Sequence, residues 1–337
     1  MRSILLLFIL VSGLSQAQEF EFKDIDFRKA DSLALAHKGQ YLDNLPVLTQ
    51  KLTADLSTDV EKFRAIYTWV STTIENDYGS YLVTTKKRKK HAKDRVAYMA
   101  WNDRYTPKMF QKIIKEQKTA CTGYAYLIRE LAHMVDIDCK IINGYGRTPT
   151  LHLSHESLPN HSWNAVQLNN TWYLCDATWS AGSTILDEDG PRFKAAYFDG
   201  YFLADPALFI KNHYPLEAEW ALLPEPPTFN EFIEGPIVYK ESFIPHIIPL
   251  SPTVMRIETI KDAPVSFQLQ TSKTFDGNRL GMSLFNGIAN ENVHPIILQD
   301  QTGFALKYVF ERSGLFDVHI LLDDAIVATY VVKVKRK

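Results

Sequence analysis

The chain has 337 residues, of which 46% are hydrophobic and 23% are charged, values typical of a soluble globular protein of about two domains. Its 37 lysines and arginines nearly balance its 39 acidic residues, so the formal charge is −2. This balance excludes a global electrostatic bias toward nucleic acid or an anionic membrane.

The N-terminus has the pattern of a targeting segment. Arg2 is followed by an apolar run over 4–14, and Ser15-Gln-Ala17 is a small-x-small cleavage sequence. The run is too short to span a bilayer, and no later run is long enough to do so. We therefore expect residues 1–17 to be a signal peptide cut near Ala17, and the protein to be secreted or periplasmic. A buried N-terminal helix is the alternative.

Residues 18 to about 117 are mostly helical in pattern. A short amphipathic helix is expected over 26–38, and a clearer one over 59–74 with Thr58 or Asp59 as its cap. Pro107 is expected to open a further helix that leads toward Cys121. The basic run Lys86–Lys93 is interpreted as a solvated loop or exposed helix face, because no aromatic residues interleave with it as in nucleic-acid-binding segments.

A helix is predicted to begin at Cys121, because apolar residues recur after it at three- and four-residue spacing. At a helix start, unpaired N–H groups and the helix dipole favour a thiolate over a thiol. The same N–H groups, including that of Cys121, are candidate donors to an oxyanion, with the side chain of Gln117 as a further candidate. An isolated cysteine is more often a small buried hydrophobe, so the rest of the chain must supply a base.

Two predicted strands, 161–168 and 171–179, are separated by Asn169 and Asn170, which tolerate the positive φ of a two-residue hairpin turn. With Leu168 opposite Thr171, position 163 faces Asp176. His161 then lies diagonal to Asp176 on the same face, within side-chain reach. The hairpin is thus predicted to present a hydrogen-bonded His–Asp pair at its open end. A further strand is predicted before it, over 139–146.

Cys121, His161 and Asp176 together suit thiol catalysis. The thiolate attacks a carbonyl, the imidazole carries the proton, and the carboxylate fixes the imidazole tautomer. Trp163 and Trp179 are candidates to line the substrate site. A zinc site of His152, His155 and His161 is the competing interpretation, although no carboxylate is placed to complete it. We expect the site to need no metal or other cofactor.

Two further cysteines, Cys139 and Cys175, accompany Cys121 in the predicted mature chain. An odd number leaves at least one free thiol. A Cys139–Cys175 disulfide and two buried reduced thiols are both compatible with the sequence, and the second is preferred.

The segment 187–223 is loop-rich and aromatic and is expected to pack against the flank of the core. Pro224-Glu-Pro-Pro-Thr228 has the composition of a linker. Short β patterns separated by turn residues follow to the end of the chain. They predict a β-sandwich that is Ig-like in general shape.

Four segments carry a family resemblance: Cys121-Thr-Gly-Tyr-Ala125, Asn143-Gly-Tyr-Gly146, His161-Ser-Trp-Asn164 and Trp172-Tyr-Leu-Cys-Asp-Ala-Thr-Trp179. Together they resemble the transglutaminase-like superfamily, in particular its kyphoscoliosis-peptidase-like branch, over about 59–223. The resemblance implies a papain-like α+β core with Cys121 as nucleophile, His161 as base and Asp176 as its orienting partner. Relatives include amide crosslinkers, proteases, deglycosylating amidases and members without known activity.

The resulting expectation has four parts: a signal peptide at 1–17, a transglutaminase-like core with N-terminal helices at 18–223, a linker at 224–228, and an all-β sandwich at 229–337. The expected function is hydrolysis of protein or peptide amides by the thiol, with amine transfer as the alternative. A non-catalytic scaffold is the rival from another class; an open groove beside Cys121 would favour an enzyme. No nucleic-acid partner is expected.

Overall fold

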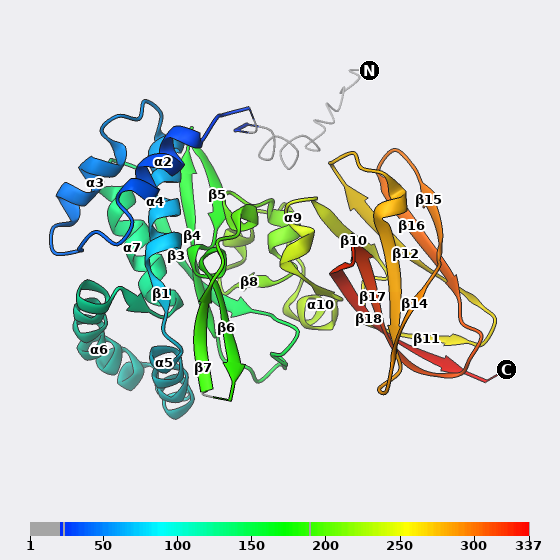
Figure 1. Ribbon diagram of the computed structural model, residues 1–337. Helices are drawn as coiled ribbons and strands as arrows, with labels where there is room; N and C mark the ends of the chain where they lie inside the picture. Colours follow the sequence, from blue (N-terminus) through cyan, green and yellow to red (C-terminus); the bar gives the residue numbers. More distant parts are fainter. Residues whose placement is uncertain (1–20, 23, 189, 337) are drawn as a thin grey trace, which may run out of the picture.

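The computed structural model describes residues 21, 22, 24–188 and 190–336, so the predicted signal peptide lies outside the described residues. Figure 1 shows N-terminal helices packed beside a central sheet, with a separate β region at the other end of the molecule. None of the described helices is long and apolar enough to cross a membrane.

Three helices form the outer layer of the core: α2 (Arg28–Ala36), α3 (Leu45–Thr53) and α4 (Asp59–Thr73). Helix α4 is the central one, and eleven of its fifteen residues are buried. Its start is fixed by a capping box, in which the Thr58 hydroxyl accepts from Glu61 N–H while the Glu61 carboxylate accepts from Thr58 N–H. The expected helices over 26–38 and 59–74 are confirmed.

The next segment begins and ends with short paired strands, β1 (Glu75–Asn76) and β2 (Lys118–Thr119), which run parallel. Between them lie α5 (Tyr78–Lys90) and α6 (Arg95–Glu116). The expectation that Pro107 opens a helix is wrong: α6 starts at Arg95, where Asp94 caps Ala97 N–H, and Pro107 lies inside it. A proline within a helix removes one backbone hydrogen bond, and here the helix continues despite that loss.

The central sheet has the order β5-β4-β3-β8. Its strands are β3 (Cys139–Gly146), β4 (His161–Leu168), β5 (Thr171–Cys175) and β8 (His213–Pro215). The hairpin register is as predicted, with Leu168 opposite Thr171 and both asparagines of the turn at positive φ (49° and 62°). Helix α7 (Cys121–His133) packs on one face of β3 and β4.

The second strand of the hairpin is shorter than expected. It ends at Cys175, because the Asp176 side chain caps a short helix, α8 (Ala177–Ala181). The segment 187–223, expected to be loop-rich, begins at the last residue of β6 (Gly182–Asp187). It contains β7 (Gly190–Ala195), which forms a hairpin with β6, then α9 (Pro206–Phe209) and β8. Short 3-10 turns occur at 199–201 and 218–221.

After the proline-rich stretch, Thr228 caps α10 (Phe229–Glu234), and the chain continues into a sandwich of two sheets around its own apolar core. One sheet contains β10 (Ile247–Ser251), β12 (Pro264–Thr271), β15 (Ile296–Gln299) and β16 (Gly303–Val309). The other contains β9 (Ile237–Val238), β11 (Arg256–Ile260), β13 (Leu280–Phe285), β14 (Asn290–Val293), β17 (Gly314–Leu322) and β18 (Ala325–Lys335). The expected C-terminal β-sandwich is confirmed.

Candidate active site

Cys121 is the first residue of α7, and its side chain lies at the junction of that helix with β2. The junction is tight, because a Cβ added at Gly123 would lie 1.9 Å from Thr119 Oγ1. Only a glycine therefore lets the first turn of α7 start so close to β2. Cys121 itself is 7% exposed, and its side chain lines a cleft.

His161 and Asp176 meet at the open end of the hairpin, as the register predicts. His161 Nε2 lies 2.7 Å from Asp176 Oδ2, and both side chains are buried. The other carboxylate oxygen, Oδ1, accepts the backbone N–H groups of Thr178 (2.8 Å) and Trp179 (3.3 Å). Because His161 Nε2 is bonded to the carboxylate, Nδ1 is the ring nitrogen available to exchange a proton with the Cys121 thiol.

The electrostatics favour a charged Cys–His pair. Burial by itself would raise the pKa of the Cys121 thiol, but hydrogen bonding to His161 and the charges of His161 and Arg88 outweigh it, so the pKa lies below its usual value. Burial would lower the pKa of His161, but Asp176 and Cys121 raise it to about 10. The Asp176 carboxyl is also buried, yet both histidines hold its pKa well below the usual range. Both shifts favour a thiolate beside an imidazolium over the neutral pair.

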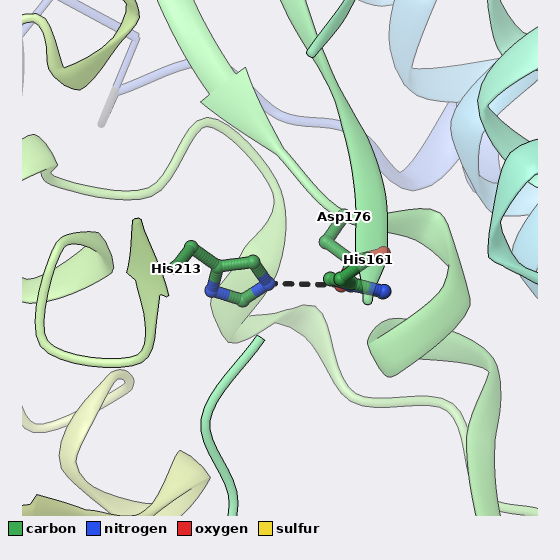
Figure 2. A group of neighbouring side chains, drawn as sticks. All are labelled: His161, Asp176 and His213. Carbon is green, nitrogen blue, oxygen red and sulfur yellow. Dashed lines mark hydrogen bonds and ion pairs between the residues drawn. The ribbon is translucent and has the colours of Figure 1, made fainter. Parts of the chain in front are cut away.

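A second histidine, His213 of β8, completes this group and was not foreseen from the sequence. Figure 2 shows its ring directed at the Asp176 carboxylate, with Nε2 3.1 Å from Oδ2. Its Nδ1 lies 2.6 Å from the side-chain amide of Asn212. The ring stacks on Phe209 at 3.9 Å between centroids and lies 4.3 Å from that of Trp179. Burial in this aromatic enclosure lowers the pKa of His213 to about 4.

The cleft beside the thiol has a volume of about 660 Å³. Its lining includes Cys121 and His161 from the core, Tyr78 and Tyr81 from α5, the 146–151 loop, and residues 238–241 at the start of the C-terminal β region. Trp179 also lines it and lies 5.1 Å from the His161 ring. An open cleft at the thiol is the arrangement expected of an enzyme rather than of a closed scaffold.

The other sequence candidates lie elsewhere. Trp163 is 1% exposed and packs under His161 and His213 in the core, outside the cleft lining. Gln117 lies at the C-terminal end of α6, where its side-chain amide donates to the Gln40 carbonyl at 2.8 Å. An amide that the sequence did not single out, that of Asn76 in β1, lines the cleft instead. Its strand pairs with the residues just before Cys121, with Asn76 opposite Thr119.

The three histidines proposed as an alternative metal site do not converge. His152 and His155 are exposed on the loop between β3 and β4, whereas His161 is buried at the start of β4. Within the described chain, ligand-type atoms gather only at His161, Asp176 and His213, within 4.8 Å of one another. The Nε2 atoms of both histidines are directed at the same carboxylate oxygen, Asp176 Oδ2. These three groups therefore hydrogen-bond to one another and do not surround a space for an ion.

All three cysteines carry free thiols and are buried. Burial raises the pKa of Cys139 to about 12 and raises that of Cys175 well above its usual value. Neither is activated, so Cys121 is the only one of the three whose pKa is lowered.

Comparison with known proteins places this geometry in a family context. Residues 46–177 match the model of the transglutaminase-like superfamily. The chain is 32% identical to human kyphoscoliosis peptidase over 201 residues (59% of this chain and 27% of that protein). It is 31% identical to the mouse protein over 219 residues (64% and 30%). Hillarin of Drosophila melanogaster is 27% identical over 230 residues (65% and 25%). The chain therefore spans less than a third of the length of each of these relatives.

Among solved structures, the Lin-41 filamin domain matches 31% of this chain and 99% of its own, at 11% identity and a TM-score of 0.23. The matched part of the core, residues 46–177, is a transglutaminase-like superfamily domain. This domain is related to that of the kyphoscoliosis peptidases, as its sequence motifs indicated.

Proposed function

We propose that the protein is a thiol-dependent acyl-transfer enzyme that cleaves peptide or protein amides through Cys121, His161 and Asp176. The observation that carries the proposal is the lowered pKa of a thiol that lines an open cleft and pairs with an imidazole held by a buried carboxylate. The word peptidase in the name of the human and mouse relatives supports the same reaction class.

In this proposal the Cys121 thiolate attacks the amide carbonyl, and the C–N bond breaks as a thioester forms. The proton held on His161 passes to the leaving amine. Water then attacks the thioester and gives one proton to His161, and the C–S bond breaks to release the acid and regenerate the thiolate beside the imidazolium. Asp176 holds the ring so that Nδ1 faces sulfur throughout. In the transferase alternative, the thioester would form in the same way, and an amine would then attack it in place of water.

The developing oxyanion needs donors close to the thiol. The backbone N–H of Cys121 at the start of α7 is one. The Asn76 amide is assigned as the second, because it lines the cleft from the strand beside that helix start. Gln117, whose amide is bonded to Gln40, is not assigned this role.

The test is direct labelling followed by substrate screening. Iodoacetamide should alkylate Cys121 rapidly at pH values below the usual thiol range, and His161→Ala should abolish this advantage. A peptide library read by mass spectrometry should then give hydrolysis products that Cys121→Ala does not form. Incorporation of a labelled amine in place of water would establish the transferase alternative. A thiol that reacts with an ordinary pH profile, unaffected by His161→Ala, would refute the proposal.

We also propose export, from the pattern of residues 1–17, and a boundary between core and sandwich within 224–228. Intact mass of the protein recovered from the medium or periplasm tests the first, since a chain that begins at Gln18 is expected. Limited proteolysis tests the second.

A further inference from the structure

A cationic surface lies next to the cleft, on α5 and the turn that follows it. Residues 78–93 hold six lysines and arginines and no acidic residue. The other 321 residues have 31 basic side chains against 39 acidic ones. An anionic partner is therefore attracted to this surface, which we call the α5 arm, and repelled by the net charge of the rest of the molecule.

The arm is continuous with the proposed active site. Tyr78 and Tyr81 at the start of α5 line the cleft. Leu82 and Val83 come next along the helix and are 48% and 44% exposed. The four lysines beyond them at 86, 89, 90 and 93 are all exposed. A single helix thus carries aromatic, then aliphatic, then basic side chains from the cleft outward.

The arm is held in place at its basic end. Arg88 donates through Nη1 to the Pro159 carbonyl at 3.0 Å, two residues before His161, and through Nε to the Tyr98 hydroxyl at 3.3 Å. Lys87 lies over the Trp101 ring of α6 at 6.0 Å. The positive charge of Arg88 also contributes to the lowered pKa of Cys121. The arm and the thiol therefore belong to one electrostatic region.

We propose that the α5 arm is a docking surface for an acidic segment of a polypeptide substrate, which presents a nearby amide to Cys121. This rests on the proposed function. A polypeptide is favoured over a nucleic acid or a lipid surface, because the arm leads into a cleft whose thiol needs an amide. Lys86 to Lys90 lie about 7–14 Å along the helix from Tyr81, a distance that two to four extended residues span.

The test uses synthetic peptides that carry a chloroacetamide group four residues from a block of ten glutamates, or of ten glutamines. The glutamate peptide should alkylate Cys121 about tenfold faster than the glutamine peptide at low salt, and 0.5 M NaCl should remove the difference. The Lys→Gln variant at 86, 89, 90 and 93 should lose the preference. The matched control, Lys→Gln at the exposed positions 38, 51, 140 and 307, should keep it. Circular dichroism confirms that both variants are folded.

The outcomes separate this proposal from the proposed function. Fast reaction with free iodoacetamide but equal rates for both peptides would overturn the docking surface alone. A thiol inert to iodoacetamide would overturn the proposed function, and substrate docking with it. A labelled DNA duplex or anionic vesicles that bind the arm more tightly than the glutamate peptide would replace the polypeptide by another class of partner.

Discussion

Asp176 has two roles that one substitution can separate. Its Oδ1 caps α8, and its Oδ2 bonds to the imidazoles of His161 and His213. Asn is as good a helix cap as Asp, so Asp176→Asn should preserve α8. It removes the negative charge, however, and its amide can present N–H groups to His161 Nε2. The ring would then carry its proton on Nδ1, facing the thiol, and could not take a second one.

The expected effect on the thiol follows from the balance at Cys121. Burial raises its pKa, and the charged His161 is the main group that reverses this. With that charge lost, the pKa should be at or above the ordinary value of 9.0. A thiol of that pKa is only about 0.1% ionised at pH 6. Alkylation at pH 6 should therefore slow by about tenfold for each pH unit by which the wild-type pKa lies below 9.0, and the difference from wild type should disappear near pH 9–10.

The assay is the rate of iodoacetamide incorporation into the Cys121 peptide, measured from pH 5 to 10. Asp205→Asn is the matched control, because Asp205 caps α9 and lies 3.3 Å from His246, in a similar arrangement away from the thiol. Its profile should be that of the wild type. If Asp176→Asn labels at pH 6 within a few-fold of the wild-type rate, the imidazolium does not control the thiol and the argument fails.

Three further substitutions probe the surroundings of the site. Asn76→Ala should lower turnover of an amide substrate by about 100-fold and leave alkylation, which forms no oxyanion, unchanged; equal losses in both would contradict the oxyanion role. His213→Phe should keep the stacking on Phe209 and cost about 1.5–3 kcal/mol of unfolding free energy at pH 7 through the lost bond to Asp176. Because the folded pKa of His213 is below its unfolded value, wild type should lose this advantage as the pH falls from about 6.5 to 4, which urea titrations at several pH values would measure. Arg147→Met should lower the unfolding free energy by about 3 kcal/mol, because three buried backbone carbonyls, those of Phe232, Gly235 and Pro236, lose their donor; an unchanged melting temperature would exclude that role.

Local pattern was sufficient to predict the central hairpin. The Asn169–Asn170 turn fixed the register, and the register alone brought His161 to Asp176. The start of α7 at Cys121 followed equally from spacing. These features depend on residues close in sequence, where turn chemistry and the two-residue period of a strand leave few alternatives.

The parts that were missed depend on contacts between distant segments. His213 follows Asp176 by 37 residues and lies in a strand of only three residues, too short for any periodic signal. It reaches the carboxylate because β8 pairs with β3 rather than with its neighbours in sequence. The participation of residues 238–241 in the cleft likewise depends on how the C-terminal β region packs. The helix start predicted at Pro107 was wrong because proline's preference for the first turn of a helix is overridden within α6, where the helix continues through it.

The cleft wall at 238–241 is held by a strand far along the chain. Val238 pairs with Ala328 of β18, and Tyr239 N–H donates to the Val327 carbonyl. During synthesis, the thiol, the imidazole and the carboxylate are all present some 150 residues before their cleft can close on this side. The nascent core thus has these three side chains long before its cleft is complete, and in the proposed enzyme full recognition of a substrate would wait until the sandwich has folded.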